Sequence, residues 1–465
     1  MNEKLAEALG YVDEKYVSAA AKRKKRKHYW IVAVAALLAL VLVLNTPRIP
    51  LIISAKAVSV ASHSRKPERP RSGSDSFRQW YEDSQKRDAL VQASMAPVVS
   101  FSTDCAREIL TGVDTTNRVW SPVNAYIALA ITAELTGGET RQQVMEVLGV
   151  NSLEELRTRI STIWEQVYRD DGKEISVLAN SLWLDKDVDY HQDTMDALAY
   201  HYYTSVYQGD LGSERTNKDI ANWLRNQTGG LFSNRTGKVD IGEDAKLALA
   251  STVYFQSQWS EKFSKDQNTQ QPFHTVEGDV TCTFLNKEGA TMNYYWGETF
   301  GAVEMELENE SSMWLILPDE GKTVNDVLGT QDYMAMITGS DTFPEENHKA
   351  MKVNLSVPKF DISSSVDLEP ALEEMGLTGI FHPLGNDFSS SVDSQTPVYL
   401  DSVNQDTRVT IDEDGVAAAS YMILDFGAGA ALPPDEIIDF ILDRPFVFAI
   451  TTGSVPIFVG TVNNP

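Results

Sequence analysis

The sequence predicts an α+β protein whose main domain occupies residues 91–465. Helix and strand signals alternate through this stretch. Trp120-Ser121-Pro122 opens a helix with a serine cap and a first-turn proline, whereas 247–259 (LALASTVYFQSQW) and 314–318 (WLILP) are typical of buried strands. The chain of 465 residues is 42% hydrophobic and 23% charged, which is enough apolar material for a substantial core. That length could hold two or three average domains, but no composition break interrupts residues 91–465, so one large domain is expected there.

The residues before this domain predict a membrane anchor. Residues 29–44 (YWIVAVAALLALVLVL) form an unbroken apolar run, and 45–53 (NTPRIPLII) can extend it toward the roughly 17 to 25 residues that a spanning helix needs. Six consecutive Lys and Arg precede the run and two aromatic residues stand at its edge, as the positive-inside rule and the aromatic belt predict. We expect a basic cytoplasmic segment at 1–28, a single transmembrane helix at 29–50, and all later residues outside the cell. A cleaved signal peptide, with a cleavage site at 55–57, and a core helix stay open as alternatives.

Residues 51–90 are predicted to be a flexible linker. They contain Pro67, Pro70, Gly73 and many serines, and they show no apolar periodicity before Ala89. Such a segment would hold the domain away from the membrane.

Charge and motifs exclude several classes of function. The net charge of −26 makes nucleic acid an unlikely partner, since phosphate binding needs a basic face. The sequence has no G-x-S-x-G elbow, no H-E-x-x-H, no Walker motif and no G-x-G-x-x-G after a strand, and its seven His are scattered. Cys105 and Cys282 are too few and too distant for a disulfide framework or a metal site, so free thiols are expected and an extracellular bridge stays open. We therefore predict neither an enzyme nor a metal or cofactor.

The stretch 409–434 (VTIDEDGVAAASYMILDFGAGAALPP) has an unusual composition. It begins as a strand, breaks at an acidic turn that ends in Gly415, continues through small residues and ends in a Gly, Ala and Pro-rich tail. With a period of two, one face carries only uncharged residues other than proline, so it could be buried in a sheet. This face consists of Val416, Ala418, Ser420, Met422 and Leu424.

Several segments together resemble the serpins, the serine protease inhibitor family. The longest is 117–150 (NRVWSPVNAYIALAITAELTGGETRQQVMEVLGV), with its Ser-Pro helix start and Gly-Glu-Thr turn. The segments 357–360 (VPKF), 368–381 (LEPALEEMGLTGIF) and 444–446 (RPF) follow in the family's order. The chain also ends on the similar stretch 458–465 (FVGTVNNP). The resemblance covers residues 95–465. It implies the serpin fold, in which several helices surround a large mixed β-sheet and smaller sheets, with an exposed reactive loop.

The resemblance also implies which residues form the hinge and the cleaved bond. The hinge would consist of Glu413, Asp414, Gly415, Val416, Ala417, Ala418, Ala419 and Ser420. Counting about fourteen residues beyond Gly415, as in the family, gives Gly429, with Ala430 or Ala431 as the other candidates for the residue before the break. Val416 departs from the usual Thr or Ser, and Tyr421 is bulkier than the usual Ala, but Tyr421 falls on the outward face.

A polar cluster beneath the main sheet is implied as well. Where serpins usually bring together Ser, Asn and His, this sequence has Ser121, Asn124, Ser251 and Gln405. These side chains can satisfy one another if every partner is made.

The function implied by the resemblance is irreversible, suicide-substrate inhibition of a serine protease. The protease would attack the loop and form an acyl-enzyme, and the loop would then insert into the main sheet as a new strand. Small residues at the candidate bond suit an elastase-like protease first and a subtilisin-like protease second. We expect a monomeric, membrane-anchored and extracellular bacterial protein without a cofactor. The alternative is a non-inhibitory serpin that acts as an extracellular binding or adhesion module.

Overall fold

The structure is a computed structural model, and the residues that it describes follow here. They are 53–61, 75–112, 115–170, 175–228, 239, 241–308, 310–382, 386–393, 398–400, 403–416 and 436–465. The predicted cytoplasmic segment 1–28 and the predicted anchor 29–50 lie outside them. Within these ranges, no helix is long and apolar enough to cross a membrane.

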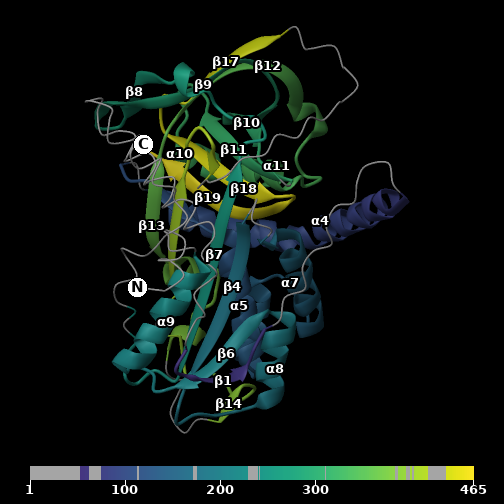
Figure 1. Ribbon diagram of the computed structural model, residues 1–465, viewed down its shortest axis with the longest axis vertical. Helices are drawn as coiled ribbons and strands as arrows, with labels where there is room; N and C mark the ends of the chain where they lie inside the picture. The colour runs from purple at the N-terminus through teal and green to yellow at the C-terminus, as the bar shows by residue number, and fades with distance from the viewer. Residues whose placement is uncertain are drawn as a thin grey trace, which may run out of the picture. The chain divides into compact units, whose positions relative to one another are not determined.

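A six-stranded sheet runs through one half of the domain (Figure 1). Its strands follow in the order β1 (Lys56–Ser59), β6 (Thr204–Gly209), β4 (Ile175–Asp185), β7 (Leu247–Gln258) and β16 (Gly415–Val416), and β3 (Arg169–Asp170) pairs with β4 off this path. Strand β4 is buried along nearly its whole length, because it lies between β6 and β7 and is covered on both faces. The predicted strand at 247–259 is β7, and it runs antiparallel to β4.

A nine-stranded sheet forms the other half. The order is β17 (Ile437–Ile441), β12 (His348–Pro358), β9 (Gly278–Trp296), β10 (Phe300–Glu306), β11 (Ser311–Pro318), β18 (Phe446–Thr452), β19 (Val455–Val462) and β2 (Arg118–Trp120), and β8 (Thr269–Thr275) pairs with β9. Strands β18 and β19 are buried at every position, so they form the centre of the core. Two small sheets complete the set: β13 (Asp361–Asp367) with β15 (Asn404–Thr410), and β5 (Asp189–Tyr190) with β14 (Val392–Asp393).

Helix α5 (Pro122–Leu135) lies at the centre of the domain. Its side chains are almost all apolar, and nearly all are buried, as expected for a helix with no solvent face. Ser121 caps it by accepting a hydrogen bond from the Asn124 backbone N–H at 3.4 Å, and Pro122 occupies the first turn as predicted. The other described helices are α4 (Asp75–Leu110), α6 (Gly138–Val147), α7 (Leu153–Val167), α8 (Gln192–His201), α9 (Glu214–Gln227), α10 (Val324–Leu328), α11 (Asp332–Thr338) and α12 (Glu369–Glu374). Short 3₁₀ turns span Lys265–Gln267, Glu345–Asn347 and Gly379–Phe381.

The structure differs from the flexible linker that we expected over residues 51–90. Lys56–Ser59 forms strand β1 on the edge of the six-stranded sheet, and helix α4 already begins at Asp75. Backbone pairing with β6 orders a segment whose side chains carry little apolar signal, and local composition cannot reveal such a partner about 150 residues away. Both cysteines are free, as expected: Cys105 is buried and Cys282 is half-buried.

Candidate functional site

The acidic turn at Asp412 reverses the chain between β15 and β16. The Asp412 carboxylate accepts hydrogen bonds from the backbone N–H groups of Asp414 (2.8 Å) and Gly415 (3.1 Å), and the Asp412 N–H donates to the Gly415 carbonyl (3.0 Å). An aspartate that bonds to the backbone two residues further on is a typical turn former. The sequence therefore builds a tight, locally closed turn at this point.

Strand β16 lies against the end of β7. Gly415 pairs with Gln258 and Val416 pairs with Ser257, antiparallel, and Val416 also forms a bridge with Ile411 just after β15. Val416 is only 2% exposed and belongs to the hydrophobic core. A side chain on Gly415 would collide with the backbone of Ser257, so only glycine fits there. The two residues thus lie between the end of β7 and Ile411, which directly follows β15.

Backbone and indole groups from the loop after β7 hold the turn in place. The Trp259 indole N–H donates to the Asp412 carbonyl (2.8 Å), and the Trp259 backbone N–H donates to the Asp414 carbonyl (3.2 Å). The Phe263 N–H donates to the Glu413 carbonyl (3.1 Å). Because Trp259 is 2% exposed, its bonds are shielded from competing water.

Glu413 adds a buried charge to this turn. Its residue is 6% exposed, and its carboxylate pairs with the Lys359 ammonium and accepts a hydrogen bond from the Asn268 amide. Burial raises the pKa of the Glu413 carboxyl, but the hydrogen bonds from Lys359, from its own backbone N–H and from Asn268 outweigh burial and hold the pKa below its usual value. By contrast, Asp414 and Lys262 form a pair at 3.0 Å in which both side chains are largely accessible to solvent.

The four residues predicted to form a polar cluster lie together beneath the sheet. The Gln405 side chain accepts from the Ser121 N–H (2.6 Å) and donates to the Ser121 carbonyl (3.0 Å), so it ties β15 to the start of α5. The Asn124 amide donates to the Ser251 carbonyl (3.3 Å), which ties the same helix to β7. Helix α5 is therefore bonded both to β15, which ends just before Ile411, and to β7, with which β16 pairs.

A fifth member of this cluster, Asn180, was missed in the sequence. The Ser251 hydroxyl contacts the side-chain carbonyls of both Asn124 and Asn180 (2.6 Å for the latter), and the Asn180 amide donates to the Tyr202 carbonyl (3.3 Å). Asn180 stands directly opposite Ser251 in the β4–β7 ladder. The only sequence signal was a lone Asn inside the apolar strand 179–184, and its partner follows from the strand register alone.

Comparison with known proteins identifies the family. The chain matches the family described as "Serpin (serine protease inhibitor)" over residues 97–465. This chain belongs to the serpin family. It is 27% identical over 379 residues to "Alpha-1-antitrypsin-like protein GS55-MS" of Ictidomys tridecemlineatus, a match that covers 79% of this chain and 88% of that one. It is 25% identical to "Plasminogen activator inhibitor 1" of Bos taurus, which covers 80% and 93% of the two chains.

Solved structures agree with this assignment. The native state of the thermophilic serpin Tengpin superposes with a TM-score of 0.70 at 26% identity and covers 88% of this chain and 100% of that one. Its latent state superposes with a TM-score of 0.66 at 25% identity, covering 81% and 97%. The resemblance seen in the sequence is therefore confirmed for the family and for its fold of helices around large mixed sheets. Serpins are protease inhibitors rather than enzymes, and the relatives support a protease-inhibitor function for this chain.

The predicted hinge of this serpin lies only in part within the described residues. Glu413, Asp414, Gly415 and Val416 lie in the turn and in β16, as given above. The remaining predicted hinge and inward-facing residues, together with the bond candidates, lie outside the described residues. They are Ala417, Ala418, Ala419, Ser420, Met422, Leu424, Gly429, Ala430 and Ala431.

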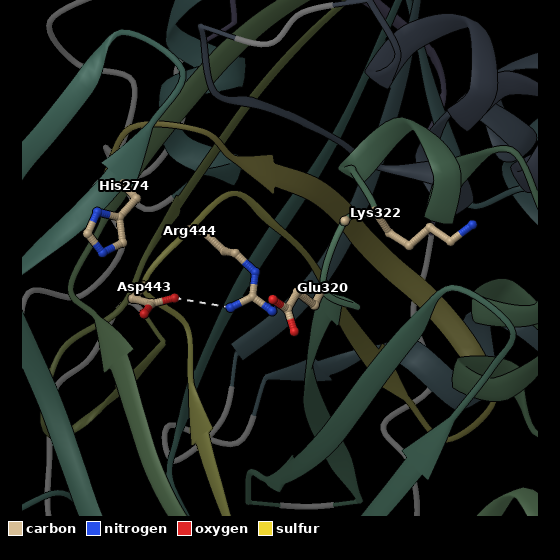
Figure 2. A pocket seen from close by; sticks show the side chains of 6 residues that line it. His274, Glu320, Lys322, Asp443 and Arg444 are labelled. Atoms are coloured by element: carbon tan, nitrogen blue, oxygen red, sulfur yellow. Dashed lines mark hydrogen bonds and ion pairs between the residues drawn. The ribbon is translucent and has the colours of Figure 1, made fainter.

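A surface pocket elsewhere on the serpin does not compete with the hinge as a functional site. Figure 2 shows Arg444 between Asp443 and Glu320. The Arg444 guanidinium donates to Asp443 (3.2 Å) and to the Pro318 carbonyl (2.9 Å), so its charge is already partnered. In the part of the chain that the structure describes, no group of three His, Cys, Asp or Glu side chains could hold a metal ion.

Proposed function

We propose that this serpin is an irreversible suicide-substrate inhibitor of serine proteases, and that its reactive loop inserts between β7 and β15. The observation that carries the proposal is the antiparallel pairing of β16 with Ser257 and Gln258 of β7. This pairing is the first step of a ladder that the loop would extend. Because Val416 is already buried and paired there, each further residue of the loop would add to an existing strand pair.

Continuing the β16 register gives each inserted residue a definite pair of neighbours. Ala418, Ser420 and Met422 would face Phe255, Val253 and Ser251 on β7, in that order. On β15 the same residues would face Val409, Thr407 and Gln405, all of which are buried. The inward set from Val416 to Leu424 carries no charge and no proline, so insertion would bury no ion and lose no backbone donor.

The outward set would meet a more open surface. Ala417, Ala419, Tyr421, Ile423 and Asp425 share this parity. Their β7 neighbours include Tyr254 and Gln256, which are half-buried and hydrogen-bonded to each other at 2.9 Å. In this register Ala417 would face Gln256 and Ala419 would face Tyr254, whereas Tyr421 would lie opposite the buried Thr252.

The inhibitory reaction would run as follows. The protease serine Oγ attacks the carbonyl carbon of the loop bond, the C–N bond breaks, and the leaving amine takes a proton to become a new N-terminus. An ester then joins the loop to the protease, and insertion would carry the protease away before water hydrolyses that ester. Each new ladder hydrogen bond would contribute about 0.5–1.5 kcal/mol. Burial of Met422 or Leu424 would add about 1.5–3 kcal/mol each.

The candidate bond residues point to the class of protease. Gly429, Ala430 and Ala431 all have small or absent side chains. A protease with a shallow primary pocket accepts such residues, whereas one that needs Arg or a large aromatic side chain does not. We favour an elastase-like protease and place a subtilisin-like protease second.

The proposal includes the cellular location. The apolar run at 29–44, preceded by six consecutive Lys and Arg, supports a single-pass anchor at 29–50 with the N-terminus in the cytoplasm and the serpin domain outside, as on a bacterial cell surface. The inhibitor would act as a monomer, since one loop and one sheet from the same chain suffice for insertion.

The test is to mix residues 53–465, which form one compact unit, with an elastase-like protease. Denaturing gel electrophoresis should show a covalent complex, and mass spectrometry of the released C-terminal fragment should identify the cleaved bond among the three candidates. If elastase-like, subtilisin-like and trypsin-like proteases all cleave the loop without forming a complex or raising thermal stability, the inhibitor proposal fails. The non-inhibitory binding module would then take its place.

A further inference from the structure

The strand that follows the predicted reactive loop exposes an apolar face. Strand β17 is the first strand in the order of the nine-stranded sheet and lies beside β12 (Figure 1). Ile437 is 62% exposed and Ile441 is 39% exposed, and the alternation of the strand puts both on the same side as the exposed Asp439. In the described part of the chain, four other large apolar side chains are exposed. Strand β17 therefore concentrates apolar surface that the fold itself does not bury.

The opposite side of β17 holds the strand in the sheet. Phe440 is buried and packs edge-on against Tyr294 of β9, with ring centroids 6.1 Å apart. Parallel pairing with β12 extends over all five residues of the strand. Core packing and backbone pairing thus fix the strand, so its exposed side chains are presented on an ordered support, which lowers the entropy cost of binding a partner.

Asp439 places a carboxylate between the two isoleucines. It accepts a hydrogen bond from the Asn354 amide on β12 at 2.7 Å, and among the described residues it forms no ion pair. Lys352 lies two positions before Asn354 on the same face of β12. Glu436, just before the strand, is paired with Lys349 at 2.6 Å. The face therefore offers apolar contact on each side of a carboxylate that can accept further hydrogen bonds.

The sequence around the candidate bond offers little contact area of its own. Residues 427–431 are GAGAA, so no side chain there is larger than a methyl group. A standard protease–inhibitor interface buries about 800 Å² on each partner. Small side chains that several kinds of protease accept also discriminate poorly between them. We therefore expect part of the contact area, and much of the specificity, to come from surface outside these five residues.

Of the two strands that the loop joins, only β17 is exposed. The chain enters the loop from β16, whose two residues are buried. It leaves the loop into β17, and Ile437 follows the last bond candidate, Ala431, by six residues in the sequence. The apolar face of β17 is thus the described apolar surface with which the loop is directly continuous in the chain.

From these observations we infer that Ile437, Asp439 and Ile441 form an exosite for the target protease. The inference rests on the proposed inhibitory function and names the surface that selects the protease. The partner supplies an apolar patch for the two isoleucines and a hydrogen-bond donor or cation for Asp439. A second copy of this chain is a poorer fit, because two β17 strands paired edge to edge about their central residue would bring the two Asp439 carboxylates together.

The rate of association tests the exosite separately from loop insertion. Residues 53–465 with Ile437→Ser/Ile441→Ser react with an elastase-like protease, and the loss of protease activity over time gives the second-order rate constant. We expect this constant to fall at least about tenfold. The stoichiometry of inhibition, which reports insertion, and the Tm should stay close to those of the wild type, because both side chains are already exposed.

The matched control is Val60→Ser. Val60 is 63% exposed and directly follows β1, which lies at the opposite end of the domain from β17 (Figure 1). This variant also removes an exposed β-branched apolar side chain, but not from the exosite. Its rate constant should equal that of the wild type.

Binding of an inactive protease repeats the test without any bond chemistry. An elastase-like protease whose nucleophilic serine is replaced by alanine can bind the serpin but cannot form the ester, so its Kd reports the encounter alone. The double variant should raise this Kd at least about tenfold. Asp439→Asn should raise it by a smaller factor and make it less dependent on salt.

The outcomes separate the exosite from the proposed inhibition. If the wild type and the double variant react and bind alike, the exosite is overturned and the inhibitor proposal stands. If no covalent complex forms but the wild type binds the inactive protease more tightly than the double variant does, the inhibitor proposal fails and the exosite stands. Equal slowing by Val60→Ser, or a wild type that sediments as a dimer while the double variant sediments as a monomer, overturns the role assigned to β17. Neither complex nor binding with elastase-like and subtilisin-like proteases overturns both proposals.

Discussion

If the loop inserts as proposed, a charge at Val416 should convert this serpin from an inhibitor into a substrate. The change is Val416→Arg, at a side chain that is 2% exposed and lies opposite Ser257 and Ile411. The matched control is Ala417→Arg, the next residue along the chain, which falls on the outward face of the continued ladder beside the half-buried Gln256.

The expected magnitude follows from burial. In the native state Val416→Arg should drive β16 out of its place beside β7, because the burial of Val416, about 1.5–3 kcal/mol, would be lost and an unpaired guanidinium buried there would cost several kcal/mol more. Insertion would then have to return the arginine to this buried place, so the cost falls on the insertion step. Even a combined cost of about 3 kcal/mol slows insertion more than 100-fold, since each 1.36 kcal/mol is a factor of ten in rate. Hydrolysis of the acyl-enzyme is unaffected by the hinge, so hydrolysis would win the competition.

The assay measures the stoichiometry of inhibition, which is the number of moles of serpin needed to inhibit one mole of elastase-like protease. Denaturing gels separate the covalent complex from the cleaved serpin. Val416→Arg should give almost only cleaved serpin, whereas Ala417→Arg should stay within a few-fold of the wild type. Equal inhibition by Val416→Arg and wild type would refute the inward register. Equal failure of both variants would show that charge anywhere in the hinge is harmful, whatever its parity.

Three further predictions concern the contacts that hold the hinge. Lys359→Ala removes the partner of the buried Glu413 carboxylate and should lower the free energy of unfolding by about 1.5–3 kcal/mol in denaturant titrations, whereas Lys262→Ala, at the more exposed pair with Asp414, should cost about 1 kcal/mol or less; equal losses would contradict the burial argument. In the folded protein the pKa of Glu413 lies below its ordinary value of 4.5. The stabilising contribution of the carboxylate is therefore complete above pH 4.5 and is lost as the pH falls through the folded pKa. The difference in free energy of unfolding between wild type and Glu413→Gln should accordingly shrink below about pH 4.5 and not above about pH 8. Gln405→Ala leaves the Ser121 N–H without its partner, while the Ser121 carbonyl keeps its hydrogen bond from the Ala125 N–H. The variant should cost about 1–3 kcal/mol, which thermal unfolding would detect as a lower Tm.

Local sequence signals were sufficient for much of the fold. The start of α5 could be predicted because Ser121 and Pro122 form a helix cap and first turn, and β7 could be predicted because 247–259 is an apolar, strand-forming run. The parity of Val416 could be read without coordinates, because alternation along a strand depends only on the chain.

Other features depend on pairings that no local pattern encodes. Asn180 matters because the ladder sets it against Ser251, and β1 forms because β6 offers an unpaired edge. The ion pair of Glu413 likewise needs Lys359, which follows β12 and lies far from Glu413 in the sequence. In each case the partner is distant in sequence, so the pairing cannot be predicted from local composition or periodicity.

On the proposed mechanism, the turn at Asp412 would let the predicted hinge be restrained in the native state and still start insertion. Insertion of an antiparallel strand needs a closed reversal before the first pair forms, and closing a loop costs entropy that later pairs must recover. Here the Asp412 carboxylate already closes the reversal, and Val416 already bridges Ser257 and Ile411. The bonds from Trp259 and Phe263 hold residues 412–414, which precede the inserting strand, so none of them has to break as the ladder grows. On the proposed mechanism, we expect resistance to insertion to lie further along, where helix α5 is bonded both to Gln405 of β15 and to Ser251 of β7.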